Sequence, residues 1–178
     1  ATARIRAEAG HPILDADGHA VLAGFLDHAL CDALVAAYDD DGRYRNRVVM
    51  ERHGFGKGEY KYFAYPLPQP VADLRQTLYP HLAPIANRWN GAMGLDLRYP
   101  STHADFIAQC HAAGQLRPTP LILRYEAGGY NCLHQDLYGA LALPLQLAVL
   151  LSNPGEDFTG GEFVLTEQRP RQQYPLQL

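Results

Sequence analysis

The stretch that most constrains the fold runs from residue 121 to residue 166, where apolar segments alternate with glycine pairs. It reads LILRYEAGGYNCLHQDLYGALALPLQLAVLLSNPGEDFTGGEFVLT. Segments 121–125 and 145–151 predict strands, and the second is so uniformly apolar that we expect it to be buried on both faces. Turn residues at 153–161 lead into a further strand at 162–165. The last third of the chain therefore predicts a sheet.

A His-x-Asp triplet, His134-Gln135-Asp136, lies between these predicted strands. In a strand, residues i and i+2 point the same way, so the imidazole and the carboxylate would reach one ion together. A second copy, His103-Ala104-Asp105, lies in a segment that predicts a helix capped by Ser101 or Thr102, where i and i+2 diverge. Because the triplet occurs twice, it is a weak signal alone. We expect a metal pair at 134–136 and a solvated helix face at the other copy.

Helical patterns dominate the first two thirds of the chain. Asp27 predicts the N-cap of a helix that ends before residues 39–42, and the second helix, 71–93, carries Pro80 and Pro84, which predict a kink or a break. A third helix covers 102–113. Short strands are expected at 13–14 and 20–22, and another at 48–50. We therefore expect one α+β domain over 1–178, helical to about residue 117 and β from about 118.

The stretch 43–65 gathers arginines and tyrosines around three glycines, Gly54, Gly56 and Gly58. The glycines predict a mobile loop, and two readings stay open. It is a structural connection, or it is a basic lid that faces the substrate. The spacing does not match a phosphate-binding fingerprint, so we do not expect a nucleotide site. The arginines and aromatic residues are Arg43, Arg45, Arg47, Arg52, Tyr44, Tyr60, Tyr62, Phe63 and Tyr65.

Composition narrows the possible partners. The 178 residues carry a net charge of −4, which gives no electrostatic reason to expect nucleic acid or an anionic membrane surface. Three widely spaced cysteines do not form a disulfide framework, so a reducing, cytoplasmic environment is expected. No signal peptide is recognisable at the start, and the apolar run 141–151 is too short to span a bilayer. Nothing in the composition predicts the oligomeric state.

The ordered set Tyr125, Gly128-Gly129, His134, Asp136 and Gly160-Gly161 resembles the iron(II)- and 2-oxoglutarate-dependent dioxygenases, in their prolyl-hydroxylase-like branch. The resemblance covers about a quarter of the chain. The upstream segments YKYFAYPLP and RPTPLILRY are similar to bacterial members of the family whose substrate is undefined. It implies a double-stranded β-helix, or jelly roll, braced by the N-terminal helices. It also implies a hydroxylase that uses iron(II), 2-oxoglutarate and dioxygen and releases succinate and CO2.

The resemblance implies roles for single residues. His134 and Asp136 would supply two arms of a two-His-one-carboxylate triad, which leaves open positions for the cosubstrate and dioxygen. Tyr125 would hydrogen-bond 2-oxoglutarate, although a core tyrosine is the alternative. Tyr130, Asn131 and Gln135 border the pair and are expected either to touch the substrate or to serve the turn. That substrate is expected to be a small molecule, an amino acid or a peptide.

The chain departs from the family pattern after the triplet. The family places a second histidine and a basic anchor for 2-oxoglutarate on later strands, but no histidine follows His134. Arg169 and Arg171 come too early to be anchors, and the closing strands of the barrel are also lacking. We expect a segment beyond Leu178 to supply these parts. The alternative is a degenerate, noncatalytic jelly-roll module that binds a metal or ligand. A cupin-like protein is a third, weaker alternative.

Overall fold

The computed structural model describes residues 12–136, 139, 141–166 and 173–176. Two compact units interleave along the chain. Unit 1 comprises Ala1–Phe25, Phe63–Pro120 and Asp136–Leu147, and unit 2 comprises Leu26–Tyr62, Leu121–Gln135 and Ala148–Leu178. Among the described residues, no helix combines the length and the apolar character that crossing a bilayer requires.

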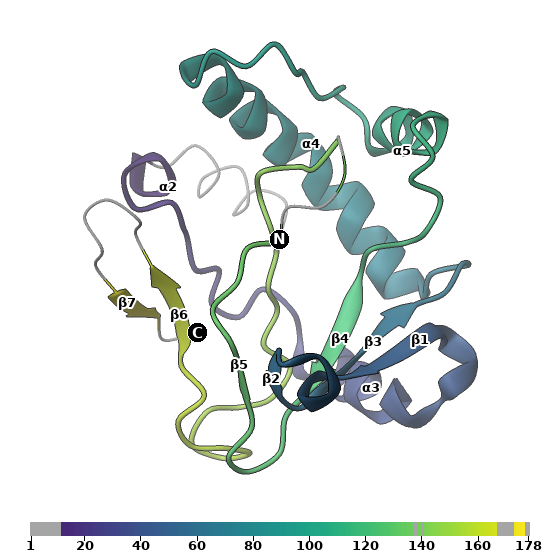
Figure 1. Cartoon of the computed structure of the whole chain (residues 1–178), viewed down its shortest axis with the longest axis vertical. Helices are drawn as coiled ribbons and strands as arrows, with labels where there is room; N and C mark the ends of the chain where they lie inside the picture. Colours follow the sequence, from purple (N-terminus) through teal and green to yellow (C-terminus); the bar gives the residue numbers. More distant parts are fainter. Residues whose placement is uncertain (1–11, 137–138, 140, 167–172, 177–178) are drawn as a thin grey trace. The chain divides into compact units, whose positions relative to one another are not determined.

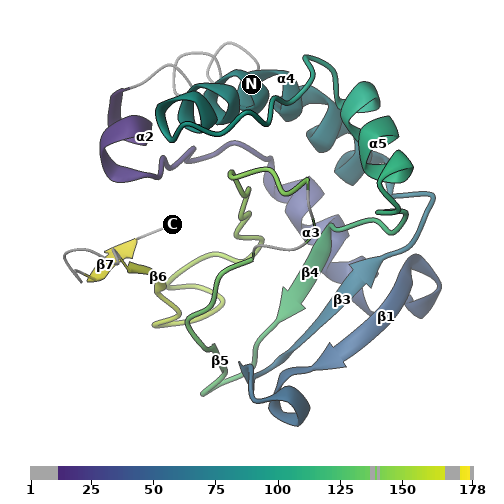
Figure 2. The same ribbon diagram turned by 45° about the horizontal axis from the view of Figure 1, so that its top comes forward.

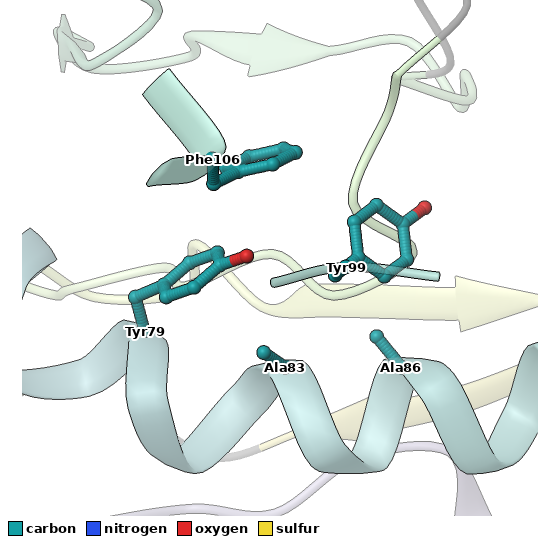
Figure 3. Packing of buried hydrophobic residues seen from close by; sticks show 5 residues of the cluster. All are labelled: Tyr79, Ala83, Ala86, Tyr99 and Phe106. Carbon is teal, nitrogen blue, oxygen red and sulfur yellow. The ribbon is translucent and has the colours of Figure 1, made fainter. Parts of the chain in front are cut away.

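Unit 1 is built on helices α2 (Pro12–Asp17), α4 (Gln69–Ala92) and α5 (His103–Ala112). In Figure 3, Tyr79, Ala83 and Ala86 point from α4 toward the rings of Tyr99 and Phe106. These α4 positions follow the helical spacing of one apolar stripe. The Phe106 ring stacks on Tyr79 at 5.2 Å between centroids and meets the edge of Tyr99 at 5.6 Å. Leucines at 97, 141, 143 and 145 pack against this cluster.

Helix α4 continues through both of its prolines, so of the expected kink or break at Pro80 and Pro84 the break is wrong, and the kink stays a prediction. Each proline removes one backbone donor, and its ring crowds the carbonyl four residues earlier. Both prolines are exposed and lie four residues apart, on one side of the helix. Water can therefore satisfy the carbonyls that lose their partner, while the opposite, apolar side holds the helix in the core.

The segment after α4 is tied to it by side-chain amides. Asn87 both accepts from the Tyr99 backbone N–H at 2.7 Å and donates to the Tyr99 carbonyl at 2.9 Å, as a strand neighbour would. Buried Asn90 donates to the Leu97 carbonyl at 3.0 Å, and the Tyr79 hydroxyl donates to that of Pro100 at 2.9 Å. These bonds satisfy backbone groups that a loop at the core edge would otherwise leave unpaired.

Unit 2 combines helix α3 (His28–Ala36) with three small antiparallel ladders. In Figure 2, strands β4 (Leu121–Arg124), β3 (Glu59–Phe63) and β1 (Tyr44–Val49) lie side by side in that order. Strand β2 (Gly56–Lys57) pairs with β5 (Tyr130–Asn131), and β6 (Phe163–Thr166) pairs with β7 (Gln173–Leu176), as Figure 1 shows. Single-turn 3-10 helices cover Ala37–Asp39, Asp41–Arg43 and Met50–His53.

The described residues therefore form a mixed α/β protein with small antiparallel sheets and without a closed barrel. Three of the strands, β1 to β3, lie before residue 117, in the part expected to be helical. Helix α2 replaces the strand expected at 13–14, and no strand forms at 20–22. The strand expected at 48–50 is the end of β1, and Met50 opens a 3-10 turn instead.

The strand expected at 145–151 is also wrong, because these residues have no regular secondary structure. Leu147, Val149 and Leu150 are exposed at 44%, 39% and 39% of their surface. A strand requires a hydrogen-bonded neighbour, and among the described residues no strand is hydrogen-bonded to this segment in a sheet. The apolar character belongs to the segment itself, whereas a strand also requires pairing with a segment elsewhere in the chain.

Candidate active site

The segment that carries the candidate residues folds back on the glycine-containing loop 54–58. Strand β4 ends at Arg124, and the Gly129 N–H donates to the Glu126 carbonyl at 2.7 Å to close a turn. Gly128 takes a φ of +73° in this turn, a conformation that favours glycine. The chain then enters β5, whose Asn131 is paired with Gly56. The Cys132 N–H continues this pairing by donating to the Phe55 carbonyl at 2.8 Å.

Tyr125 lies directly after β4 and packs on the same loop. A Cβ atom added at Gly58 would lie 2.8 Å from Tyr125 Cδ1, so the ring is seated against bare backbone. Burial raises the pKa of the Tyr125 phenol, and a side-chain hydrogen bond with Asn131 acts in the opposite direction. The residue still exposes 43% of its surface, because only part of the ring is covered by Gly58. Tyr125 is thus held on one side and open on the other.

His134 is an exposed residue whose ring orientation is fixed by its own backbone. Its Nδ1 lies 2.8 Å from the Cys132 carbonyl oxygen, which accepts hydrogen bonds only. In the neutral ring, Nδ1 therefore carries the proton, and the lone pair is on Nε2. This is the arrangement that histidine ligands of metals use, with the second nitrogen bonded to a carbonyl or a carboxylate.

Asp136 is exposed, and its Oδ2 accepts a hydrogen bond from Gln146 Nε2 at 3.0 Å. The boundary between the two units falls between Gln135 and Asp136. His134 therefore belongs to unit 2 and Asp136 to unit 1. No strand covers residues 132–136, and the pair is therefore not presented by an extended ladder as the alternation rule predicts. The assignment of both residues as metal ligands stays a prediction.

The donor chemistry of these two residues fits two of the three protein ligands of a mononuclear iron(II) site. A neutral imidazole with its lone pair on Nε2 and a hydrogen-bonded carboxylate are the groups that such sites use. The described residues contain no group of three or more His, Cys, Asp or Glu side chains that could hold a metal ion. Gly160 and Gly161, expected to shape a tight turn, both have positive φ angles and immediately precede Glu162 and β6.

A buried carboxylate, Glu59, organises the sheet beside this segment. It accepts hydrogen bonds from the Tyr38 hydroxyl at 2.9 Å, from Arg47 Nε at 2.7 Å and from Arg124 Nη2 at 2.8 Å. Burial alone would raise the pKa of Glu59, but the bonds from Arg47 and Tyr38 and the charge of Arg124 together lower it. We call these four residues the Glu59 cluster. It joins the end of the α3 segment to β1, β3 and β4.

Cations also flank the ring of Tyr38. Lys61 Nζ lies 4.4 Å from its centroid and the Arg124 guanidinium carbon 4.5 Å from it, which is cation–π distance. Lys61 is 5% exposed and donates to the Tyr38 carbonyl at 2.9 Å and to Asp41 Oδ1 at 2.7 Å. The buried charges of this sheet are therefore compensated by hydrogen bonds.

A cavity of about 200 Å³ opens next to the Glu59 cluster. Its floor includes the backbone of Gly58 and Gly129, and its charged lining carries three bases and three acids. The two guanidiniums among them already bind Glu59. The charged lining residues are Arg47, Lys57, Arg124, Glu51, Glu59 and Glu126.

The arginines of the stretch 43–65 mostly serve unit 2 itself. Arg43 pairs with Asp40 at 2.8 Å, Arg45 lies over the Tyr62 ring at 4.2 Å, and Arg47 binds Glu59. The loop that follows is paired through β2, and it is not an open flap. These contacts favour the structural reading of this stretch over the substrate-facing lid.

Three further candidates behave differently from one another. Asn131 shares a side-chain hydrogen bond with Tyr125, Tyr130 exposes 59% of its surface, and Gln135 is exposed and is the last residue of the segment Leu121–Gln135 of unit 2. Sequence reasoning missed Glu59, Lys61 and Arg124. In the strand sequence EYKYF, the alternation places two charged residues on the buried side and the tyrosines on the other. The sequence of β3 alone does not indicate that its charged side is the buried one, because the partners of these charged residues lie far away in the sequence.

Comparison with known proteins gives an independent view of the same segment. A family model described as an oxygenase catalysing oxidative methylation of damaged DNA, Oxygenase-NA, matches residues 58–177. Two proteins of Mycobacterium tuberculosis, uncharacterized protein Rv2227 of strain H37Rv and uncharacterized protein MT2286 of strain CDC 1551, are each 47% identical over 133 residues. The match covers 75% of this chain and 54% of each relative, so the chain spans about half their length. No solved structure matches.

The family match includes Tyr125, His134, Asp136 and the pair Gly160-Gly161, and it extends over about two thirds of the chain. The sequence-based expectation of an oxygenase is thereby confirmed at the level of the family. This chain belongs to the Oxygenase-NA family of oxygenases.

Proposed function

We propose that the chain is part of an iron(II)- and 2-oxoglutarate-dependent oxygenase that hydroxylates a carbon–hydrogen bond of its substrate. One observation carries the proposal. The ordered set of Tyr125, His134, Asp136 and Gly160-Gly161 falls wholly inside the segment that matches an oxygenase family. The order of these residues is the one that the prolyl-hydroxylase-like branch of the class displays.

In this proposal, His134 binds iron through Nε2, while its Nδ1–H remains on the Cys132 carbonyl. Asp136 would supply the carboxylate, and Gln146 would orient it by donating from Nε2 to Asp136 Oδ2. The Tyr125 hydroxyl would hydrogen-bond 2-oxoglutarate. Bound iron(II) would supply dioxygen activation coupled to the decarboxylation of 2-oxoglutarate to succinate.

The proposal includes the jelly-roll core. The three small ladders would form part of a double-stranded β-helix, with further strands, the second histidine and the basic anchor supplied elsewhere in a longer protein. The relatives have room for such parts, since the match covers only 54% of their length.

The family description and the charge distribution of the chain favour two different classes of substrate. The family description names damaged DNA. The net charge of −4 and the engagement of Arg43, Arg45 and Arg47 inside unit 2 favour instead an amino-acid side chain, a peptide or a small molecule. A DNA substrate would need phosphate contacts from other residues of the whole protein.

The test uses the longer protein that contains this chain, supplied with iron(II), 2-oxoglutarate and dioxygen. Succinate release is measured with a methylated single-stranded oligonucleotide and, separately, with a panel of free amino acids and proline-containing peptides. His134→Ala and Asp136→Ala are each expected to reduce substrate-dependent succinate release by at least about 100-fold, because each removes a metal ligand.

His19→Ala is the matched control. His19 is half-buried and also places Nδ1 near the carbonyl of residue i−2, at 3.1 Å from the Asp17 oxygen. This variant is expected to keep full activity. Activity that survives in both His134→Ala and Asp136→Ala would refute the proposed function, and binding of the metal without turnover would identify a noncatalytic module.

A further inference from the structure

Tyr125 is positioned by two segments that are distant in the sequence. On one side, the backbone of loop 54–58 comes so close that a Cβ at Gly58 would lie 2.8 Å from Tyr125 Cδ1 and 3.1 Å from Cε1. Contacts under 3.0 Å are not tolerated between such atoms, so any side chain at Gly58 must displace the ring or the loop. Gly58 also has a φ of +149°, which side chains rarely adopt.

The loop cannot simply move away, because two further close approaches hold it in register. A Cβ at Gly56 would lie 2.2 Å from the Tyr130 carbonyl oxygen, and a Cβ at Gly129 would lie 3.1 Å from the Lys57 carbonyl oxygen. Backbone pairing fixes the same register, with Gly56 opposite Asn131 and Lys57 opposite Tyr130. The three glycines therefore form a seam, Gly56, Gly58 and Gly129, along which the two segments meet as bare backbone.

The other contact to Tyr125 comes from Asn131. Its side chain shares a hydrogen bond with the tyrosine, which acts to lower the pKa of the phenol against the effect of burial. Asn131 is itself fixed by its place in β5 and by the adjacent bond from the Cys132 N–H to the Phe55 carbonyl at 2.8 Å. Both the ring and the hydroxyl of Tyr125 are thus oriented by the same paired segments.

We infer that Gly58 and Asn131 are positioning residues for the cosubstrate: the seam seats the ring of Tyr125, and Asn131 holds the hydroxyl that would bind 2-oxoglutarate. The inference rests on the proposed function and deepens it. In this inference, loop 54–58 is a fixed support for the Tyr125 ring and not a moving lid. Neither Gly58 nor Asn131 touches the reacting atoms, so the consequence lies in cosubstrate binding and not in the chemical step.

The first pair of variants is Gly58→Ala and Gly54→Ala in the longer protein. Gly54 also has a positive φ, of +70°, but a Cβ there meets nothing within 4 Å. Both substitutions strain the backbone, and only the first pushes on Tyr125. The second pair is Asn131→Ala and Asn46→Ala. Asn46 is an exposed residue of β1 in the same unit and serves as the matched loss of an amide.

Gly58→Ala and Asn131→Ala are expected to raise KM for 2-oxoglutarate about tenfold with kcat changed less than about twofold, since uniform binding is lost. Gly54→Ala and Asn46→Ala should leave both constants unchanged. Unchanged KM in Asn131→Ala, with wild-type activity present, overturns the inference. Asn131→Ala keeps the test decisive if Gly58→Ala does not fold.

A second readout does not depend on turnover. With 3-fluorotyrosine at position 125, a 19F NMR titration reports the phenol directly, and Asn131→Ala is expected to raise its pKa relative to the labelled parent. An unchanged titration overturns the role of Asn131. If the titration shifts as expected but the parent protein shows no succinate release, the proposed function fails while the positioning of Tyr125 stands.

Discussion

The centres of the two units are held together by different forces. Unit 1 buries aromatic rings and alanines around α4, and its cluster includes no charged side chain among the described residues. Unit 2 buries Glu59 and Lys61 in the middle of its sheet and compensates them with guanidiniums, a phenol, a carbonyl and a carboxylate. The difference predicts that unit 1 responds to loss of volume, whereas unit 2 responds to loss of charge and to pH.

The largest effect is expected from Phe106→Ala in unit 1. Phe106 is 8% exposed and contacts two other rings, so its removal should lower the free energy of unfolding by about 4 kcal/mol. Trp89, the only tryptophan of the chain, lies in α4 and reports the transition by fluorescence in urea. Leu116→Ala, at a residue that is 62% exposed, should cost less than about 0.5 kcal/mol. A similar loss in both variants would contradict the comparison.

A smaller effect, in unit 2, is expected from Glu59→Gln, which keeps the shape and removes the charge. Three donors lose their anionic acceptor, so we expect a loss of about 2 kcal/mol, measured by hydrogen exchange of the β3 amides. The folded-state pKa of Glu59 is lowered, so its contribution is present above the ordinary carboxyl pKa and is lost as the pH falls through the folded value.

The pH dependence separates Glu59 from other carboxylates. The Glu59→Gln variant should lose less β3 protection on acidification than the parent protein does, because the titrating group is gone. Glu162→Gln, at an exposed glutamate of the same unit, is expected to follow the parent. Equal acid sensitivity in the parent and in Glu59→Gln would show that the cluster does not govern this unit.

The smallest effect is expected from Pro80→Ala in α4. The substitution restores a backbone donor and relieves crowding, and the gain is partly offset by the greater freedom of the unfolded chain. A net increase of about 1 kcal/mol in the free energy of unfolding is expected in urea. Thr77→Ala, at an exposed position one turn earlier, should change it by less than about 0.5 kcal/mol. A destabilised Pro80→Ala would show that the proline itself contributes to the core.

Local signals allowed several elements to be predicted from the sequence. Asp27 caps α3 by accepting from the Leu30 N–H at 2.8 Å, and Thr102 caps α5 by accepting from Asp105 at 3.1 Å. Strand β4 lies within the expected 121–125, and the helix expected at 102–113 ends as predicted near Gly114. Each of these elements is specified by residues within one or two turns of its end.

The elements that sequence reasoning missed depend on distant partners or on a signal that was overlooked. Pro12 begins α2, and proline is favoured at the first position of a helix, so a signal was present there. Nothing within the sequence of β3 indicates that Glu59 meets Arg47, 12 residues earlier, and Arg124 on another strand. The prediction of metal ligands at His134 and Asp136 came from motif order and not from a regular element that holds both residues.

The burial of Tyr38 against Glu59 has a chemical consequence. The ring is 5% exposed, and burial together with the bond to Glu59 raises the pKa of its phenol, although Arg124 and Arg47 oppose this. Nitrating reagents such as tetranitromethane attack the ionised form of an accessible tyrosine. They should therefore spare Tyr38 and label Tyr130, at 59% exposure, so a nitration map would distinguish the interior of this sheet from its rim.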